Sequence, residues 1–245
     1  MKTWRADVIG RYAHPERGFT QGLIVSDGTI WESIGRYGNS ALYRYPLGAA
    51  RLGQHTALPE ELFAEGICRA GKVIWQLTYR ERVALRWDPH SLELVKQVPY
   101  DREGWGICVA DGYIVTSDGS SELVHRDPQT LGARDVVHVR CAGRGVRGLN
   151  DLAWSAGVIW ANVVGTNYLA GIDPESGEVT DIVNASPAAE LYPGNPHTVM
   201  NGIAALPLGG DFLLTGKGWR WIRHVRLRPD RDRAACEQLF TGWLR

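Results

Sequence analysis

The sequence repeats one pattern five times, and this repeat constrains the fold more than any other feature. Each copy is a short apolar segment, a glycine-containing turn and a second apolar segment, which is typical of a β-hairpin. The only helix-like fragment, PEELFAEG, is short. The five copies are QGLIVSDGTIWES from Gln21, EGICRAGKVIWQLT from Glu65, WGICVADGYIVTSD from Trp105, NDLAWSAGVIWANV from Asn150 and NGIAALPLGGDFLLTGK from Asn201.

The spacing of the copies predicts the architecture. Their starts lie about 40 to 50 residues apart, the length of a four-stranded propeller blade. A third apolar segment ending in a proline-containing turn recurs at the same period, as RYPLG, RWDPHS, HRDPQT, GIDPESG and LRPDR. We therefore expect an all-β fold, a five-bladed β-propeller with four-stranded blades that forms a single domain over residues 1–245. An open β-sandwich of unrelated hairpins is the alternative.

The first strand candidate, WRADVIGRY, precedes the first hairpin and has no partner in its own repeat. We expect this N-terminal strand, around Asp7–Tyr12, to pair with the C-terminal blade and close the ring. Such closure would also remove two open sheet edges.

Charge and composition exclude several classes of partner. Lys+Arg and Asp+Glu both number 27, so the basic surface typical of a nucleic-acid-binding protein is not expected. No apolar run approaches the ~20 residues that span a bilayer, and the N-terminus lacks the apolar segment of a secretory signal. The expectation is a cytoplasmic monomer without nucleic-acid or membrane partners.

The four cysteines are Cys68, Cys108, Cys141 and Cys236, and no two of them form a CxxC motif. Neither a zinc site nor a thioredoxin-like motif is therefore indicated. Cys68 and Cys108 share a local pattern, EGIC and WGIC, which suggests a repeated packing position. We expect four buried, reduced thiols.

Topology turns the repeat into a site prediction. In a propeller the first strand of each blade runs beside the central channel, so equivalent residues at the strand starts converge on one mouth. These residues are Gln21, Glu65, Trp105, Asn150 and Asn201, and the return strands would bring Glu32, Thr78, Tyr79, Asp118, Asn162 and Lys217 to the same rim. The next position is glycine in four copies, Gly22, Gly66, Gly106 and Gly202, with Asp151 as the exception. Glycine there permits close approach of backbones near the axis.

Each of these residues also has a purely structural interpretation. The amides could bond turn backbone, Trp105 could fill the core between blades, and Glu65 could belong to an ion pair. The chain has only four lysines against 23 arginines, so the lysine at position 217 in TGKGW departs from the chain's preference for arginine. The variety of residue types at one repeat position favours a site.

Several ordered segments resemble the plant- and bacterial-type glutaminyl-peptide cyclotransferases (glutamine cyclotransferases). They cover about residues 12–220 and are HPERGFTQGL (14–23), ESIGRYGNS (32–40), FAEGI (63–67), EGWGI (103–107), SDGS (117–120), LNDL (149–152), IWANV (159–163), NGIA (201–204) and TGKGW (215–219). The resemblance implies a five-bladed propeller. It also implies a pocket formed by Phe19, Gln21, Phe63, Glu65, Trp105, Asn150 and Lys217.

The sequence departs from the family pattern at a few positions. This chain has LTY where the family has LTW, and WANVV where the family has WANVW. Tyr79 and Val164 therefore replace two pocket tryptophans. This chain has NDLA where the family has NELE, so Asp151 and Ala153 stand at the positions of two family carboxylates. It also has FAEG where the family has FGEG. The polar group of the pocket is intact, whereas its aromatic wall has lost area.

The implied reaction converts an N-terminal glutamine to pyroglutamate with release of ammonia. Glu65 is the candidate proton shuttle, as base and then acid. Lys217 and Asn150 are candidate donors to the oxyanion, and Gln21 would orient the amine. Phe19, Phe63, Tyr79 and Trp105 would select the curled conformer, with Asn201 as a further substrate-binding residue. The partner is a peptide or protein N-terminus bearing glutamine. No cofactor is required, since no phosphate-binding glycine loop is present; a structural divalent cation stays open.

Two other functions stay open at this stage. A metal-dependent propeller hydrolase of lactonase type could use Glu65, Asn150, Asn201 and Asp118 as oxygen ligands to Ca²⁺, although Lys217 would repel a divalent cation. A non-catalytic, peptide-binding propeller is the other alternative.

Overall fold

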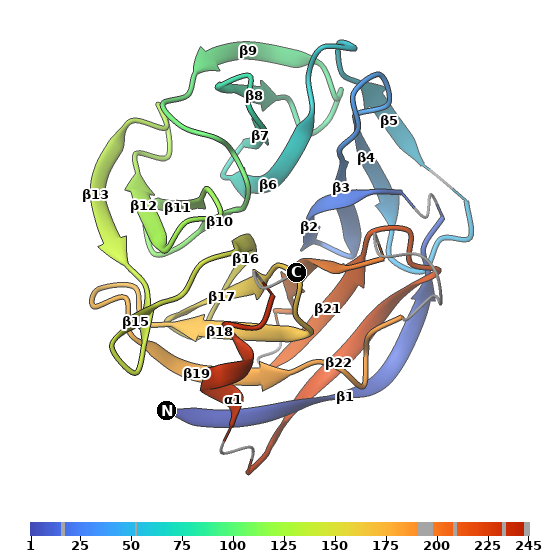
Figure 1. Ribbon diagram of the computed structural model, residues 1–245. Coiled ribbons are helices and arrows are strands. Elements are labelled where there is room, and N and C mark those ends of the chain that lie inside the picture. The colour runs from blue at the N-terminus through green and yellow to red at the C-terminus, as the bar shows by residue number, and fades with distance from the viewer. Residues whose placement is uncertain (16–17, 52, 191–197, 208–209, 232–233, 243–245) are drawn as a thin grey trace.

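The computed structural model describes residues 1–15, 18–51, 53–190, 198–207, 210–231 and 234–242. Over these ranges the chain is all β apart from one four-residue helix, α1 (Ala235–Gln238). The sheets are arranged around a common centre, as in a propeller (Figure 1). Of the described helices, none is both long and apolar enough to cross a membrane.

All five predicted hairpins are confirmed as antiparallel pairs. They are β2 (Thr20–Ser26) with β3 (Thr29–Ile34), β6 (Ala64–Ala70) with β7 (Val73–Thr78), β10 (Ile107–Val109) with β11 (Ile114–Ser117), β16 (Leu149–Ser155) with β17 (Val158–Val163), and β20 (Met200–Ala205) with β21 (Asp211–Gly216). Residues 16–17 of the first motif and 208–209 of the last turn lie outside the described residues.

Each hairpin is extended by a third strand that ends at the predicted proline turn, and four of them by a fourth strand from the same repeat. The third strands are β4 (Ala41–Pro46), β8 (Val83–Trp87), β12 (Glu122–Arg126), β18 (Tyr168–Ile172) and β22 (Trp221–Pro229); the fourth are β5 (Gln54–Ala57), β9 (Leu94–Pro99), β13 (Ala133–His138) and β19 (Val179–Asn184). The helix-like fragment PEELFAEG is a turn that leads into β6.

The N-terminal strand β1 (Lys2–Ala13) completes the last repeat. It pairs antiparallel with β22 from Trp4 to Ala13, which confirms the predicted pairing of Asp7–Tyr12 with the C-terminal strands. Its first residues also pair in parallel with β19, over Lys2–Arg5. Since β1 pairs with two neighbours, the last two repeats merge into one eight-stranded sheet, in which β1 lies between β19 and β22 at the periphery of the molecule (Figure 1).

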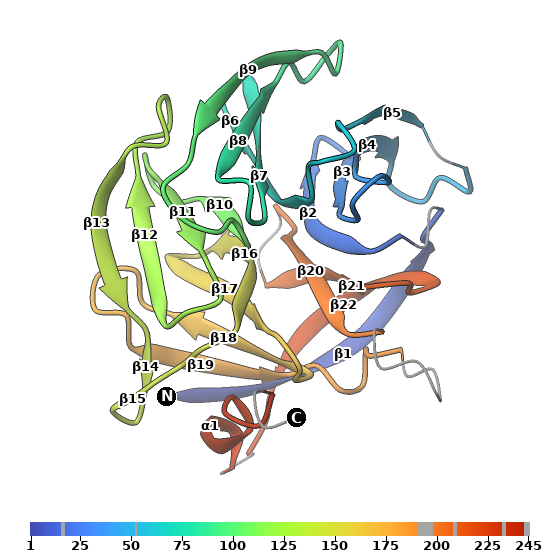
Figure 2. The same ribbon diagram turned by 45° about the horizontal axis from the view of Figure 1, so that its top comes forward.

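The inner strands approach one another closely around the centre (Figure 2). β2 contacts β6 and β20, β10 contacts β6 and β16, and β16 contacts β20, so the contacts form a closed cycle. A Cβ atom on Gly66 would lie 2.5 Å from the Trp105 carbonyl oxygen, and one on Gly106 would lie 1.9 Å from that of Asn150. Backbone contact therefore requires glycine at positions 22, 66 and 106, as predicted, whereas Gly202 has a positive φ of 115° and faces the side chain of Thr215.

The core fills the spaces between neighbouring sheets with buried aliphatic and aromatic side chains. Cys68 and Cys108 are buried and reduced, as expected. The expectation for the other two cysteines is wrong, because Cys141 and Cys236 form a disulfide. This bond links α1 to the small hairpin β14 (Arg140–Cys141) and β15 (Arg144–Gly145), two segments that only the tertiary fold brings together.

Candidate active site

Four inner strands share an irregularity at their first residues. Register shifts fall between Thr20 and Gly22, Ala64 and Ile67, Leu149 and Leu152, and Met200 and Ile203. Such bulges redirect a side chain out of the regular alternation of a strand and are frequent beside active sites. Here they fall on Gln21, Glu65, Asn150 and Asn201, four of the five predicted strand-start residues.

Gln21, Glu65, Trp105 and Asn150 come together in one pocket of about 210 Å³. The complete lining is Phe19, Gln21, Phe63, Glu65, Tyr79, Trp105, Asn150, Val164 and Lys217. The volume is below the roughly 300–1,000 Å³ of sites for drug-sized ligands. The pocket is therefore suited to a single residue rather than to a long stretch of peptide.

Glu65 is the buried carboxylate of this pocket, with 5% of its surface exposed. Its Oε1 accepts a hydrogen bond from Gln21 Nε2 at 3.4 Å. Burial raises the pKa of Glu65 well above its usual value of 4.5; nearby Lys217 opposes this effect, and the charge of Asp151 adds to it. A carboxyl group with a raised pKa can exchange protons near neutral pH.

Lys217 supplies the positive charge of the pocket. Its Nζ lies 4.3 Å from the centroid of the Phe19 ring. Burial lowers the pKa of Lys217, while the carboxylate of Glu65 raises it. The turn that carries Lys217 is anchored by backbone bonds from Lys217 N to Val199 O at 2.9 Å and from Gly218 N to Gly18 O at 2.8 Å. An ammonium in this position can donate to an anionic oxygen.

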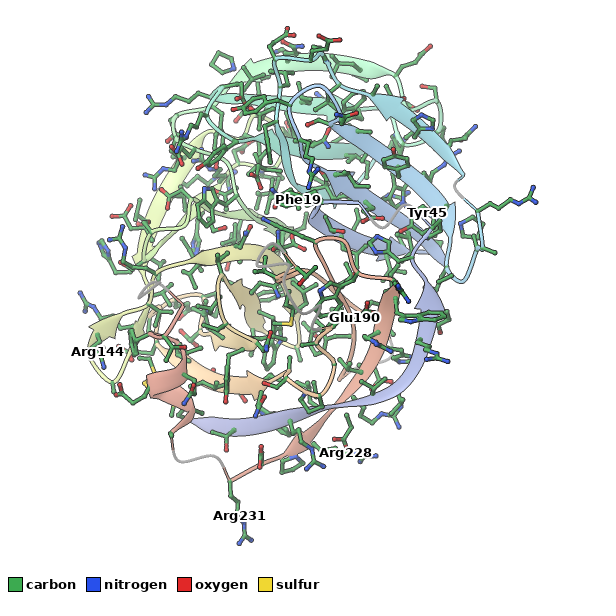
Figure 3. All side chains as sticks on the ribbon, turned by 45° about the vertical axis from the view of Figure 1, so that its right-hand side comes forward. Phe19, Tyr45, Arg144, Glu190, Arg228 and Arg231 are labelled. Carbon is green, nitrogen blue, oxygen red and sulfur yellow. A yellow bond between two sulfur atoms is a disulfide. The ribbon has the colours of Figure 1, made fainter. Side chains whose placement is uncertain are left out.

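The wall of the pocket is a chain of aromatic rings. Phe63 lies 6.5 Å from Phe19 and 5.8 Å from Tyr79, and Tyr79 lies 6.5 Å from Trp105, measured between ring centroids. Gly119 makes room for Trp105, since a Cβ atom there would lie 2.6 Å from its ring. The labelled Phe19 lies near the middle of the molecule (Figure 3).

Tyr79 and Val164 both line the pocket, at the two positions where tryptophan was expected by resemblance. The hydroxyl of Tyr79 accepts a hydrogen bond from Arg80 Nη2 at 3.1 Å, and the Arg80 guanidinium lies over the Tyr79 ring. The sequence did not indicate that an arginine would hold this ring from outside the pocket.

Asn201 does not line the pocket but lies behind it. Its Nδ2 donates to Gln21 Oε1 at 2.8 Å and to the Thr20 carbonyl oxygen at 3.1 Å. The structure therefore places Asn201 against Gln21 and not in the lining of the pocket, and its contact with substrate stays a prediction.

Most of the other predicted rim residues are engaged elsewhere. Glu32 pairs with His14, Thr78 donates to the Val83 carbonyl, Asp118 accepts from Arg102, and Asn162 accepts from Gly202 N. The Ca²⁺ ligand set considered above is consequently dispersed, because Asp118 and Asn201 do not face Glu65 and Asn150 in the pocket. Over the described ranges, no group of three or more His, Cys, Asp or Glu side chains could hold a metal ion.

Larger cavities among the described residues lie away from these groups. One of about 500 Å³ is lined by residues that include Asp27 and His90, one of about 280 Å³ is lined by residues that include His14 and Trp221, and one of about 270 Å³ lies near the buried thiols Cys68 and Cys108. Volume alone would favour the first. The smaller pocket is the better candidate because convergent polar groups with shifted pKa values mark functional sites.

Comparison with known proteins points to one family. The sequence matches the family model described as glutamine cyclotransferase over residues 1–227. It is 29% identical over 227 residues to a glutaminyl-peptide cyclotransferase of Arabidopsis thaliana, a match that covers 91% of this chain and 71% of that protein. The fold is similar to the crystal structure of the Myxococcus xanthus glutaminyl cyclase, with a TM-score of 0.87 and 32% sequence identity, covering 94% of this chain and 99% of that one.

Proposed function

Because the chain belongs to the glutamine cyclotransferase family, we propose that the pocket around Glu65 converts the N-terminal glutamine of peptides or proteins to pyroglutamate. The activity is that of a glutaminyl-peptide cyclotransferase, an acyltransferase. The observation that supports this pocket as its site is the presence of a buried carboxylate and a partly buried ammonium in one small aromatic pocket.

The reaction needs no external nucleophile. The α-amine attacks the side-chain carboxamide carbon of the same residue, and a new C–N bond closes a five-membered ring. The tetrahedral intermediate then collapses, and the bond to the amide nitrogen breaks. One proton leaves the attacking amine and one joins the departing nitrogen, so ammonia is released and the protons balance.

Glu65 has the properties needed for both proton transfers. As a carboxylate it accepts the proton of the attacking amine, and as a carboxylic acid it returns that proton to the leaving nitrogen. Its raised pKa brings the exchange of this proton closer to neutral pH, and such transfers contribute about 10²–10⁴-fold. The hydrogen bond from Gln21, itself oriented by Asn201, fixes the carboxylate in the pocket.

Lys217 and Asn150 are placed to stabilise the intermediate. The ammonium of Lys217 and the amide of Asn150 would donate to the oxyanion, where one donor contributes roughly 3 kcal/mol. The Asn150 Oδ1 atom is buried and accepts no hydrogen bond from the described residues. A substrate N–H group would therefore find an acceptor at this residue.

The aromatic wall supports the conformational part of catalysis. Phe19, Phe63, Tyr79 and Trp105 exclude water from one side of the pocket and restrict a bound glutamine to its curled form. Holding reacting atoms in contact lowers the entropic part of the barrier. The small volume of the pocket fits this role.

The arrangement of strands supports the finer architecture expected from the sequence. We infer that residues 1–245 form a single domain with five four-stranded blades. Three blades are separate four-stranded sheets, and two are the halves of the eight-stranded sheet, β16–β19 and β20–β22 with β1. With five such blades, one strand start of each repeat would lie around a common axis.

The function is tested with a synthetic peptide that begins with glutamine. Incubation should release one ammonia per peptide and yield a product lighter by that ammonia, and the rate should persist in EDTA. The matched control is the same peptide with its α-amine acetylated, which cannot attack. Binding without ammonia release would instead support a peptide-binding protein, and activity lost in EDTA would indicate a metal-dependent enzyme.

A further inference from the structure

A buried ion pair lies directly behind the pocket, between the first and last repeats. His14 Nε2 lies 2.7 Å from Glu32 Oε1, and neither side chain is exposed. Burial opposes the charge of each group, but their attraction outweighs it, so the pKa of His14 is raised and that of Glu32 is lowered. Both shifts favour the charged forms, an imidazolium facing a carboxylate.

The remaining hydrogen-bonding positions of the pair are occupied by neighbouring strands. Glu32 Oε1 also accepts from Thr20 Oγ1 at 2.7 Å, and Glu32 Oε2 accepts from the Tyr45 hydroxyl at 2.6 Å. His14 Nδ1 donates to the Trp219 carbonyl oxygen at 2.8 Å. A protonated imidazole donates from both nitrogens, which matches this geometry.

The segments that the pair joins are those that carry the pocket. Thr20 lies between Phe19 and Gln21, and Trp219 closes the turn that carries Lys217, with its N–H bonded to Gly216 O at 3.1 Å. His14 and Glu32 thus connect the Phe19–Gln21 segment of one repeat to the Lys217 turn of another. Neither of them lines the pocket.

We propose that His14 and Glu32 are positioning residues that hold the Phe19–Gln21 segment and the Lys217 turn at the separation that catalysis needs. This proposal rests on the proposed function. The pair touches no substrate and acts through Lys217, whose ammonium must meet the oxyanion as it forms. A displacement of about 1 Å in such a group can cost about 10²-fold in rate.

The variant Glu32→Gln removes the carboxylate charge and keeps the size of the side chain. We expect kcat of the folded protein to fall by about 10- to 100-fold, with KM within about 3-fold of wild type, because the lost interaction is one made in the transition state. A residue that only stabilises the fold would lower the melting temperature and leave kcat per folded molecule unchanged.

Asp211→Asn is the matched control. Asp211 also pairs with a histidine, His224, at 3.0 Å, and it lies at the start of β21, whereas Lys217 follows the end of the same strand. This variant should lower the melting temperature without changing kcat. If the two variants lower kcat alike, the His14–Glu32 pair has no special relation to the site and the proposal is wrong.

Two further measurements keep the test decisive if Glu32→Gln folds poorly. Tyr45→Phe removes one hydrogen bond to Glu32 and should cause a smaller loss of kcat in the same direction. In a protein that already carries Lys217→Met, Glu32→Gln should lower kcat by less than about 3-fold. The effects of substitutions at residues that act through one another are not additive. Full additivity, or an unchanged kcat in Tyr45→Phe and Glu32→Gln, would overturn the proposal. An inactive wild type would refute the proposed function itself.

Discussion

The ammonium of Lys217 lies over the ring of Phe19, with Nζ 4.3 Å from the ring centroid. Among the ion pairs of the described residues, none joins Lys217 to Glu65, although both line the same pocket. A cation that lies over an aromatic ring, without an ion-pair partner, can donate its N–H groups to a substrate oxygen. The two charged groups of the pocket can therefore act on different atoms of one substrate.

The acid limb of the pH–rate profile should respond to the charges around Glu65. The base must be ionised, so kcat/KM falls as the pH drops through the raised pKa of Glu65. Lys217→Met removes a cation that lowers this pKa and should move the limb to higher pH. Glu103→Gln removes a charge that raises it and should move the limb to lower pH.

Opposite shifts in these two variants identify Glu65 as the titrating group. The amine of the substrate titrates near pH 7.7–8.0 and does not respond to either substitution. Profiles measured with excess enzyme would show this directly. A limb that stays in place in both variants would mean that it belongs to the substrate.

Glu65→Gln should stabilise the protein at neutral and alkaline pH. The pKa of Glu65 in the folded state is raised above the usual value of 4.5. Between pH 4.5 and that raised value, the folded state binds a proton that the unfolded state has lost, so the free energy of unfolding falls as the pH rises. The variant avoids this loss. Its melting temperature should exceed that of wild type at pH 8, by about 2–4 °C per kcal/mol, and equal it at pH 4. A lower melting temperature at pH 8 would indicate that Glu65 is a structural ion-pair partner.

Lys217→Met should lower kcat by about 10²–10³-fold, because one oxyanion donor is lost. Glu65 and Lys217 act on the same tetrahedral intermediate, so the double variant Glu65→Gln/Lys217→Met should cost less than the product of the two single effects. Single-turnover rates of the four proteins give this comparison. Independent, multiplying effects would contradict a shared intermediate.

Tyr79 should contribute to turnover through its ring rather than its hydroxyl. Tyr79→Ala removes contacts with Phe63 and Trp105, and aromatic pairs contribute about 0.5–1.5 kcal/mol each, so kcat/KM should fall by about 10-fold. Tyr79→Phe loses the hydrogen bond from Arg80 and keeps the ring, and it should stay near wild type. Equal losses in the two variants would assign the role to the hydroxyl.

The repeats made most of the fold predictable, because strand, turn and return strand are local in the sequence. The convergence of Gln21, Glu65, Trp105 and Asn150 followed from topology, and the glycine after Glu65 was a visible signal of the close approach at the axis. Asn150 and Asn201 occupy equivalent positions, yet only Asn150 lines the pocket. That difference depends on the contact between Asn201 and Gln21, which no local pattern encodes.

The long-range pairings could not be predicted from the sequence either, because no local pattern encodes them. Cys141 and Cys236 are 95 residues apart and meet through α1. His14 and Glu32 both lie in segments that resemble the family, but their pairing depends on how the first and last repeats pack together. The pattern of apolar segments and turns in the sequence predicts which strands form, whereas tertiary packing decides the partner of a buried side chain.

The most direct test of the account is the single-turnover rate of Glu65→Gln with a peptide that begins with glutamine. The matched control is Glu103→Gln, which removes a nearby carboxylate that does not line the pocket and should stay within about 3-fold of wild type. Glu65→Gln should fold and bind the peptide normally, while ammonia release falls by about 10²–10⁴-fold. A Glu65→Gln protein that releases ammonia at the wild-type rate would contradict the mechanism.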